Sequence, residues 1–167
     1  MRLDTFLQSL QDTSFATAIR EDATLFPWIE CFHVLALTLV IGSIAIMDLR
    51  LLGVASKDRG VAQTAAAVLP VTWTAFALAV LTGSLLFSSN ATTYAHNFYF
   101  QVKLVLITLA GVNMGVYHLF LDQGVDTWHT AELTPLRARI IGGVSLCLWV
   151  GIAACGRWIG FSINTPT

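Results

Sequence analysis

The feature that most constrains this chain is an apolar run from Phe26 to Met47. Its only Asp, Glu, Lys, Arg or His side chains are Glu30 and His33. As a helix, about 22 residues extend over roughly 33 Å, enough to cross the hydrocarbon core of a bilayer. The run therefore predicts a transmembrane helix. Because an ionisable side chain is costly to bury in lipid, we expect Glu30 and His33 to face the bundle interior.

Three further apolar stretches have the same character. The spans are predicted at about 26–47, 65–87, 98–121 and 140–161. Only 11% of the 167 residues are charged, whereas a soluble domain carries about 25%. Short loops between long spans predict an all-α fold: an integral membrane four-helix bundle that forms a single membrane domain over residues 1–167. Membrane lipid is then a partner, and the net charge of −1 gives no reason to expect nucleic acid.

The segment before the first span has a different pattern. Apolar residues recur at helical spacing among polar ones: Leu3, Phe6, Leu7 and Leu10. This pattern predicts a short N-terminal helix within residues 1–24 that lies in the membrane interface. No basic stretch followed by an apolar core and a cleavage site is present, so we expect the segment to be retained.

Charge in the loops predicts the orientation. The loops at 48–64 and 122–139 carry five positive side chains: Arg50, Lys57, Arg59, Arg137 and Arg139. The loop at 88–97 has no Lys or Arg. The positive-inside rule places the two positive loops in the cytoplasm. We therefore expect a multi-pass protein of the bacterial inner membrane with both termini in the periplasm.

The predicted topology brings several polar side chains to one depth. His33 is seven residues into the first span and Lys103 five residues into the third, so their depths agree within roughly 3 Å. Glu30 and Arg157 lie near the same outer level. His118 is near the inner face, about 22 Å away. We expect His33 and Lys103 to share a site, and His118 to belong to another; the alternative is that these groups only hold helices together.

Two GxxxG motifs, at Gly111–Gly115 and Gly156–Gly160, predict close helix packing. The packing is either inside the bundle or between protomers, so a homo-oligomer or a larger membrane complex is expected. The cysteines lie in apolar segments without metal-binding spacing, and we interpret them as small hydrophobic residues.

Several short motifs together resemble a known group of proteins. "F-H-V-L-A-L" opens the first span and "D-L-R-L-L-G" closes it; "L-T-G-S-L-L-F" lies in the second, and "F-Y-F-Q-V-K-L-V-L-I" opens the third. Over residues 26–121 the chain resembles small bacterial membrane proteins of the copper-resistance D-type and membrane haem-b protoporphyrinogen oxidase group. It looks most like an uncharacterised branch of that group.

The resemblance implies a haem b site. In the oxidase the histidine of the first span is associated with haem and the lysine of the "V-K-L" motif is functionally important; these positions match His33 and Lys103. We expect a haem-b protein that passes electrons to or from quinone or a partner oxidoreductase. His33 would be the axial metal ligand and Glu30 would orient its ring, while Lys103 and Arg157 would neutralise propionates. His118 would be the ligand of a second, inner site.

Other functions remain open. A porphyrin-oxidising enzyme fits less well, because the segment after the first span, "L-L-G-V-A-S-K-D-R", has no histidine. Transport of copper or protons would use the ionisable side chains as a relay, although only three methionines are available and an apolar stretch separates the two levels. A structural or assembly subunit of a membrane complex would use the polar groups for packing alone.

Overall fold

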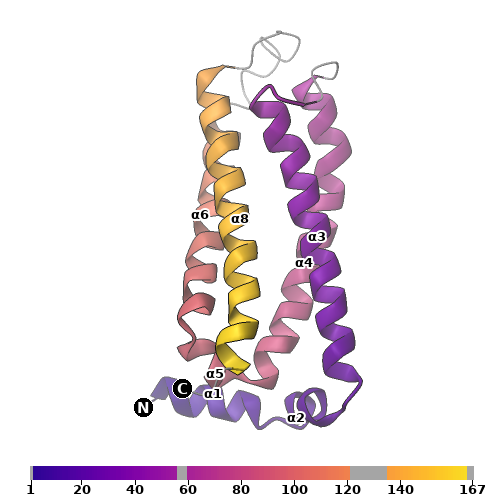
Figure 1. Ribbon diagram of the computed structural model, residues 1–167, viewed down its shortest axis with the longest axis vertical. Coiled ribbons are helices and arrows are strands. Elements are labelled where there is room, and N and C mark those ends of the chain that lie inside the picture. The colour runs from indigo at the N-terminus through magenta and orange to yellow at the C-terminus, as the bar shows by residue number, and fades with distance from the viewer. Residues whose placement is uncertain (1, 56–59, 121–134, 165–167) are drawn as a thin grey trace.

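In the computed structural model, which describes residues 2–55, 60–120 and 135–164, four long helices stand side by side (Figure 1). They are α3 (Leu25–Leu51), α4 (Val61–Ser89), α6 (Phe98–Phe120) and α8 (Leu136–Asn164). All four are long and apolar enough to cross a membrane. The described residues contain no strand. The predicted all-α membrane bundle is therefore confirmed.

Three of the helices, α3, α4 and α8, are longer than the predicted spans, because a helix continues until its backbone is capped rather than stopping at the edge of the apolar run. In α3 the cap is at Gly53, which has a φ of 72°, and the Val54 N–H donates to the Leu49 carbonyl at 3.0 Å. Residues 48–51, predicted as loop, are consequently helical. In the same way α4 reaches Ser89, and α8 begins at Leu136 rather than at 140.

Parts of the predicted connections cannot be compared. Residue 121, predicted as the end of the third span, lies outside the described residues. So do residues 56–59 and 122–134 of the two positively charged loops.

The long helices pack around a shared apolar core. α3 lies against α4 and α8, and α8 also lies against α6. Side chains from all four helices meet midway along the bundle: Val40, Ala75, Ala110, Trp149 and Ile152. A second cluster, built on Leu51, Val61 and Ala138, fills the end of the bundle away from the termini.

The N-terminal segment forms two helices rather than the single one predicted. They are α1 (Arg2–Gln11) and α2 (Ser14–Glu21), which lie across one end of the bundle (Figure 1). The break comes at Thr13, whose hydroxyl accepts a hydrogen bond from the Ala16 N–H at 3.3 Å and so caps α2. A capping residue inside an amphipathic stretch divides one helix into two.

Hydrogen bonds attach α1 and α2 to the connection between α4 and α6. That connection, predicted as irregular, contains the short helix α5 (Ala91–His96). The Arg20 guanidinium donates to the Ser89 carbonyl at 3.0 Å, and the Thr92 hydroxyl donates to the Gln11 side chain at 2.8 Å. His96 pairs with Asp4 at 3.1 Å. These bonds hold the N-terminal helices across the end of the bundle, where both termini lie (Figure 1).

Asp22 organises the turn between α2 and α3. Its carboxylate accepts hydrogen bonds from the Thr24 hydroxyl at 2.7 Å, the Thr24 N–H at 2.8 Å and the Leu25 N–H at 3.1 Å. Because these bonds favour the charged form, they hold the pKa of Asp22 below its usual value. The exposed carboxylate thus remains ionised at neutral pH.

Candidate functional site

His33 reaches from α3 across to α4. Its Nδ1 lies 2.9 Å from the Thr82 hydroxyl oxygen. The ring lies flush against Gly83, since a Cβ placed there would be 2.9 Å from the His33 Cε1. Real Cβ atoms do not approach other atoms so closely, so any other residue at position 83 would require the imidazole or the helix to shift. The group that approaches the Gly83 backbone is thus the His33 ring.

The hydrogen bonds of Thr82 determine which nitrogen of His33 carries the proton. A hydroxyl has one hydrogen to donate, and Thr82 directs its hydroxyl at the Leu78 carbonyl, 2.7 Å away. We therefore assign Nδ1 of His33 as the donor in its bond to Thr82, on the basis of this hydrogen-bond network. In a neutral imidazole this leaves the lone pair on Nε2. The Ala79 backbone also forms a hydrogen bond with the His33 side chain.

Lys103 lies at the same level as His33, as the depth comparison predicts. It comes from α6, and its ammonium is close enough to His33 to interact with it electrostatically. On α8, a Cβ at Gly156 would lie 3.6 Å from Nζ of Lys103, and the neighbouring Cys155 thiol is also within electrostatic range. Lys103 forms no ion pair with any residue in the described part of the chain. The bundle therefore places, beside a histidine, a lysine amino group that has no anionic partner among the described residues.

Glu30 and Arg157 are placed differently from His33 and Lys103. Glu30 is exposed on α3, and Thr82 is the partner of His33 where we expected Glu30. The Glu30 carboxylate lies towards Tyr94 on α5. The pKa of Tyr94 is raised mainly by burial, and in addition by the negative charge of Glu30. Arg157 is exposed on α8, with its guanidinium 4.9 Å from the centre of the Phe161 ring.

His118 is separated from His33 by most of the length of α6. It is exposed, and its ring meets Tyr117 edge-on with centroids 5.6 Å apart. Lys103 precedes it by fifteen positions, or about 22 Å along a helix. Among the described residues, no group of three or more His, Cys, Asp or Glu side chains is arranged to hold a metal ion. His33 and His118 are therefore not two ligands of one centre.

The sequence interpretation missed Thr82 and the role of Gly156. The only signal for Thr82 was its place beside Gly83 in "L-T-G-S", which identifies a motif but not a partner for His33. Gly156 was interpreted as a helix-packing residue, whereas the group nearest to it across the bundle is the Lys103 amino group. At Gly111 and Gly115 a Cβ would meet no atom within 4 Å, so this motif packs against no helix of the bundle.

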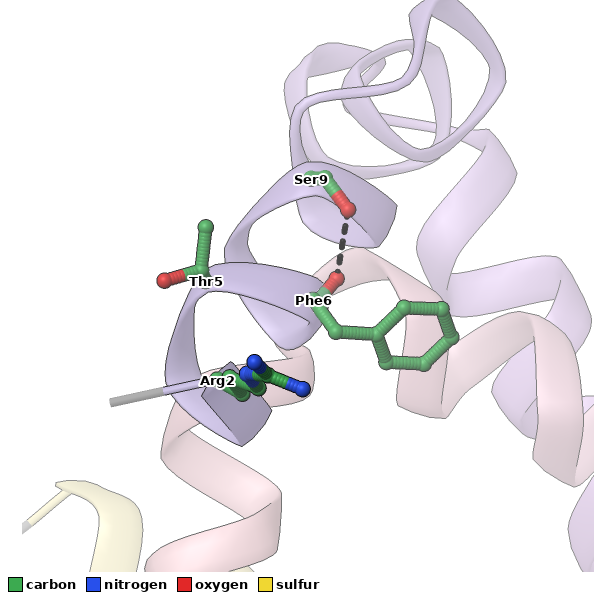
Figure 2. Close-up of a pocket in the computed structure, with 4 residues that line it drawn as sticks. All are labelled: Arg2, Thr5, Phe6 and Ser9. Carbon is green, nitrogen blue, oxygen red and sulfur yellow. Dashed lines mark hydrogen bonds between the residues drawn. The ribbon is translucent and has the colours of Figure 1, made fainter.

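A shallow open depression lies on α1, away from these residues. Figure 2 shows its lining, Arg2, Thr5, Phe6 and Ser9. The one hydrogen bond drawn there joins the Ser9 hydroxyl to the Phe6 carbonyl of the same helix, at 2.7 Å. The depression is thus a surface of one helix and includes no residue of the His33 site.

Four apolar helices of spanning length, with polar groups facing each other inside the bundle, define a multi-pass helical membrane protein. The model of a family of unknown function (DUF6644) matches residues 11–162, and the chain belongs to this family. No curated protein and no solved structure matches the chain.

Proposed function

We propose that this protein binds haem b in the membrane through His33 and passes electrons to or from quinone or a partner oxidoreductase. The observation that carries the proposal is the hydrogen bond between His33 Nδ1 and the Thr82 hydroxyl, at 2.9 Å. With Nδ1 as the donor, the lone pair of a neutral imidazole is on Nε2, which would bind the iron. A metal-ligating histidine typically donates its other ring N–H to a fixed acceptor, and Thr82 supplies that acceptor here.

The residues around His33 fit one axial ligand and one propionate. Nε2 would be the ligand atom, and at Gly83 no side chain of α4 pushes the ring out of place. Lys103 is a cation that would neutralise a carboxylate at this level. The haem would supply the one-electron chemistry. This chain's residues would hold its iron, fix the His33 ring and balance its charge.

The test is a reduced-minus-oxidised visible spectrum of the full chain, purified in detergent from a haem-replete host. We expect a b-type band that is lost in His33→Ala and retained in His96→Ala, the matched control, because His96 is exposed and pairs with Asp4. In His118→Ala the band should also persist if a single haem is bound; partial loss would indicate a second haem. Absence of any haem band in the wild type would refute the proposal.

A structural or assembly subunit is the alternative that a specific observation favours. Gly111 and Gly115 present a surface of α6 on which nothing within 4 Å would meet a Cβ, as expected for a helix that packs against another chain. Co-purification of a stable partner together with absence of haem would favour this role. Copper or proton transport lacks comparable support, since Ala36 and Val40, on α3 between His33 and Asp48, are fully buried apolar residues.

A further inference from the structure

Asp48 is buried in the membrane-spanning bundle at the end opposite the His33 site. It lies in the last turn of α3, and only 4% of its surface is exposed. Its backbone lies against α8 at Gly142, where a Cβ would be 3.1 Å from the Asp48 carbonyl oxygen. The close approach of the two helices leaves water little access to the side chain. A charged group in such a place requires a partner.

The carboxyl group has one partner and lacks another. The Ser145 side chain on α8 forms a hydrogen bond with it, whereas Oδ2 is buried without a hydrogen-bond partner. Asp48 forms no ion pair with a described residue. At this end of the bundle the titratable side chains of the described residues are Arg50 on α3, Tyr117 and His118 on α6, and Arg137 and Arg139 on α8. Nothing described therefore compensates a negative charge on Asp48.

We propose that Asp48 is a proton-binding site, whose carboxyl group is a neutral acid in the folded protein. A neutral acid can donate its hydroxyl hydrogen to Ser145 and leave only an uncharged carbonyl oxygen without a partner. A carboxylate would leave a buried charge with a single hydrogen bond, which is far more costly. Intramembrane carboxyl groups of this kind bind and release protons in response to changes in their surroundings. The site does not depend on the proposed haem.

The experiment is an infrared spectrum of the full chain in lipid bilayers at neutral pH, in the region of the protonated-carboxyl C=O stretch. We expect a band in the wild type that shifts on ¹³C labelling of aspartate and disappears in Asp48→Asn. Asp22→Asn is the matched control and should keep the band, because the Asp22 carboxylate is exposed and accepts three hydrogen bonds. Asp48→Asn should also keep the wild-type melting temperature, since an amide resembles the neutral acid.

Two results would overturn the proposal. One is a wild-type spectrum without a protonated-aspartate band, which does not depend on how any variant folds. The other is a loss of thermal stability in Asp48→Asn that is much larger than the loss in Asp22→Asn, because an amide can replace a neutral acid but cannot replace a required negative charge.

Discussion

At the scale of single residues, the absence of a side chain decides where the polar groups of this bundle lie. The His33 ring fits against α4 because residue 83 is glycine, and Lys103 lies beside another glycine, Gly156 on α8, where a Cβ would make an ordinary contact at 3.6 Å. In lipid a polar side chain cannot turn to water, so it must find a partner inside the protein. Small residues on facing helices therefore determine which polar side chains can meet.

Gly83→Ala should displace the His33 ring, because the added Cβ would lie 2.9 Å from Cε1. We expect a loss of stability of about 1–3 kcal/mol from overpacking, together with loss of any haem band that depends on His33. Thermal unfolding in detergent and the visible spectrum measure the two effects.

Gly42→Ala is the matched control on α3, since no atom lies within 4 Å of the added Cβ. It should be neutral, or stabilising by up to about 1 kcal/mol from helix propensity. If both variants behaved alike, the contact between His33 and Gly83 would not exist in solution.

At the scale of elements, the two N-terminal helices are held to the bundle by a small number of specific bonds. Leu7, Ala16 and Ile19 are buried towards the bundle, while Phe6 and Phe15 stay exposed. Exposed aromatic side chains on helices across the membrane end suit the water–lipid boundary. The half-buried Arg20 joins three segments, since it donates to the Gln11 carbonyl at 3.3 Å as well as to Ser89.

Arg20→Ala should loosen α1 and α2 without unfolding the long helices. Hydrogen bonds to a charged group contribute about 1.5–3 kcal/mol, so local opening of residues 2–21 should become roughly ten-fold or more frequent. Hydrogen exchange with mass spectrometry measures the change when exchange rates in residues 2–21 are compared with those in α3, which should not change. Glu21→Gln, on the same helix and exposed, should leave exchange unchanged; equal protection in Arg20→Ala would contradict the role given to Arg20.

At the scale of the whole molecule, the order of the helices around the core is α4, α3, α8, α6. The first and third long helices, α3 and α6, run in the same direction because the chain crosses the bundle once between them. They are not neighbours in this order, so His33 and Lys103 interact across the bundle interior. Side-chain bonds join the second pair of long helices, since Asn113 donates to the Ile141 carbonyl at 3.2 Å and Asn97 to the Ser162 hydroxyl at 2.8 Å. Such bonds contribute about 0.6 kcal/mol each in membranes.

The expected topology can be measured with single cysteines placed in a background without Cys31, Cys147 and Cys155. Ser9→Cys on α1 and Val54→Cys, which is 69% exposed beyond the end of α3, lie at opposite ends of the bundle. A membrane-impermeant maleimide should label Ser9→Cys from the periplasm of intact cells. Val54→Cys should react only after lysis. The reverse pattern would invert the orientation, and labelling of both from outside would exclude four spans.

The sequence alone determined the four spans and the depth at which His33 and Lys103 lie. A bilayer imposes length and apolar composition on any helix that crosses it, so these features can be read along the chain. Helix ends were less predictable, because caps such as Gly53 and Thr13 act beyond the apolar runs. Only the tertiary structure decided that Thr82 accepts from His33, that Lys103 lies beside Gly156, and that α8 buries Asp48. Periodicity places a residue on one face of its helix, but the packing of other helices decides what that face meets.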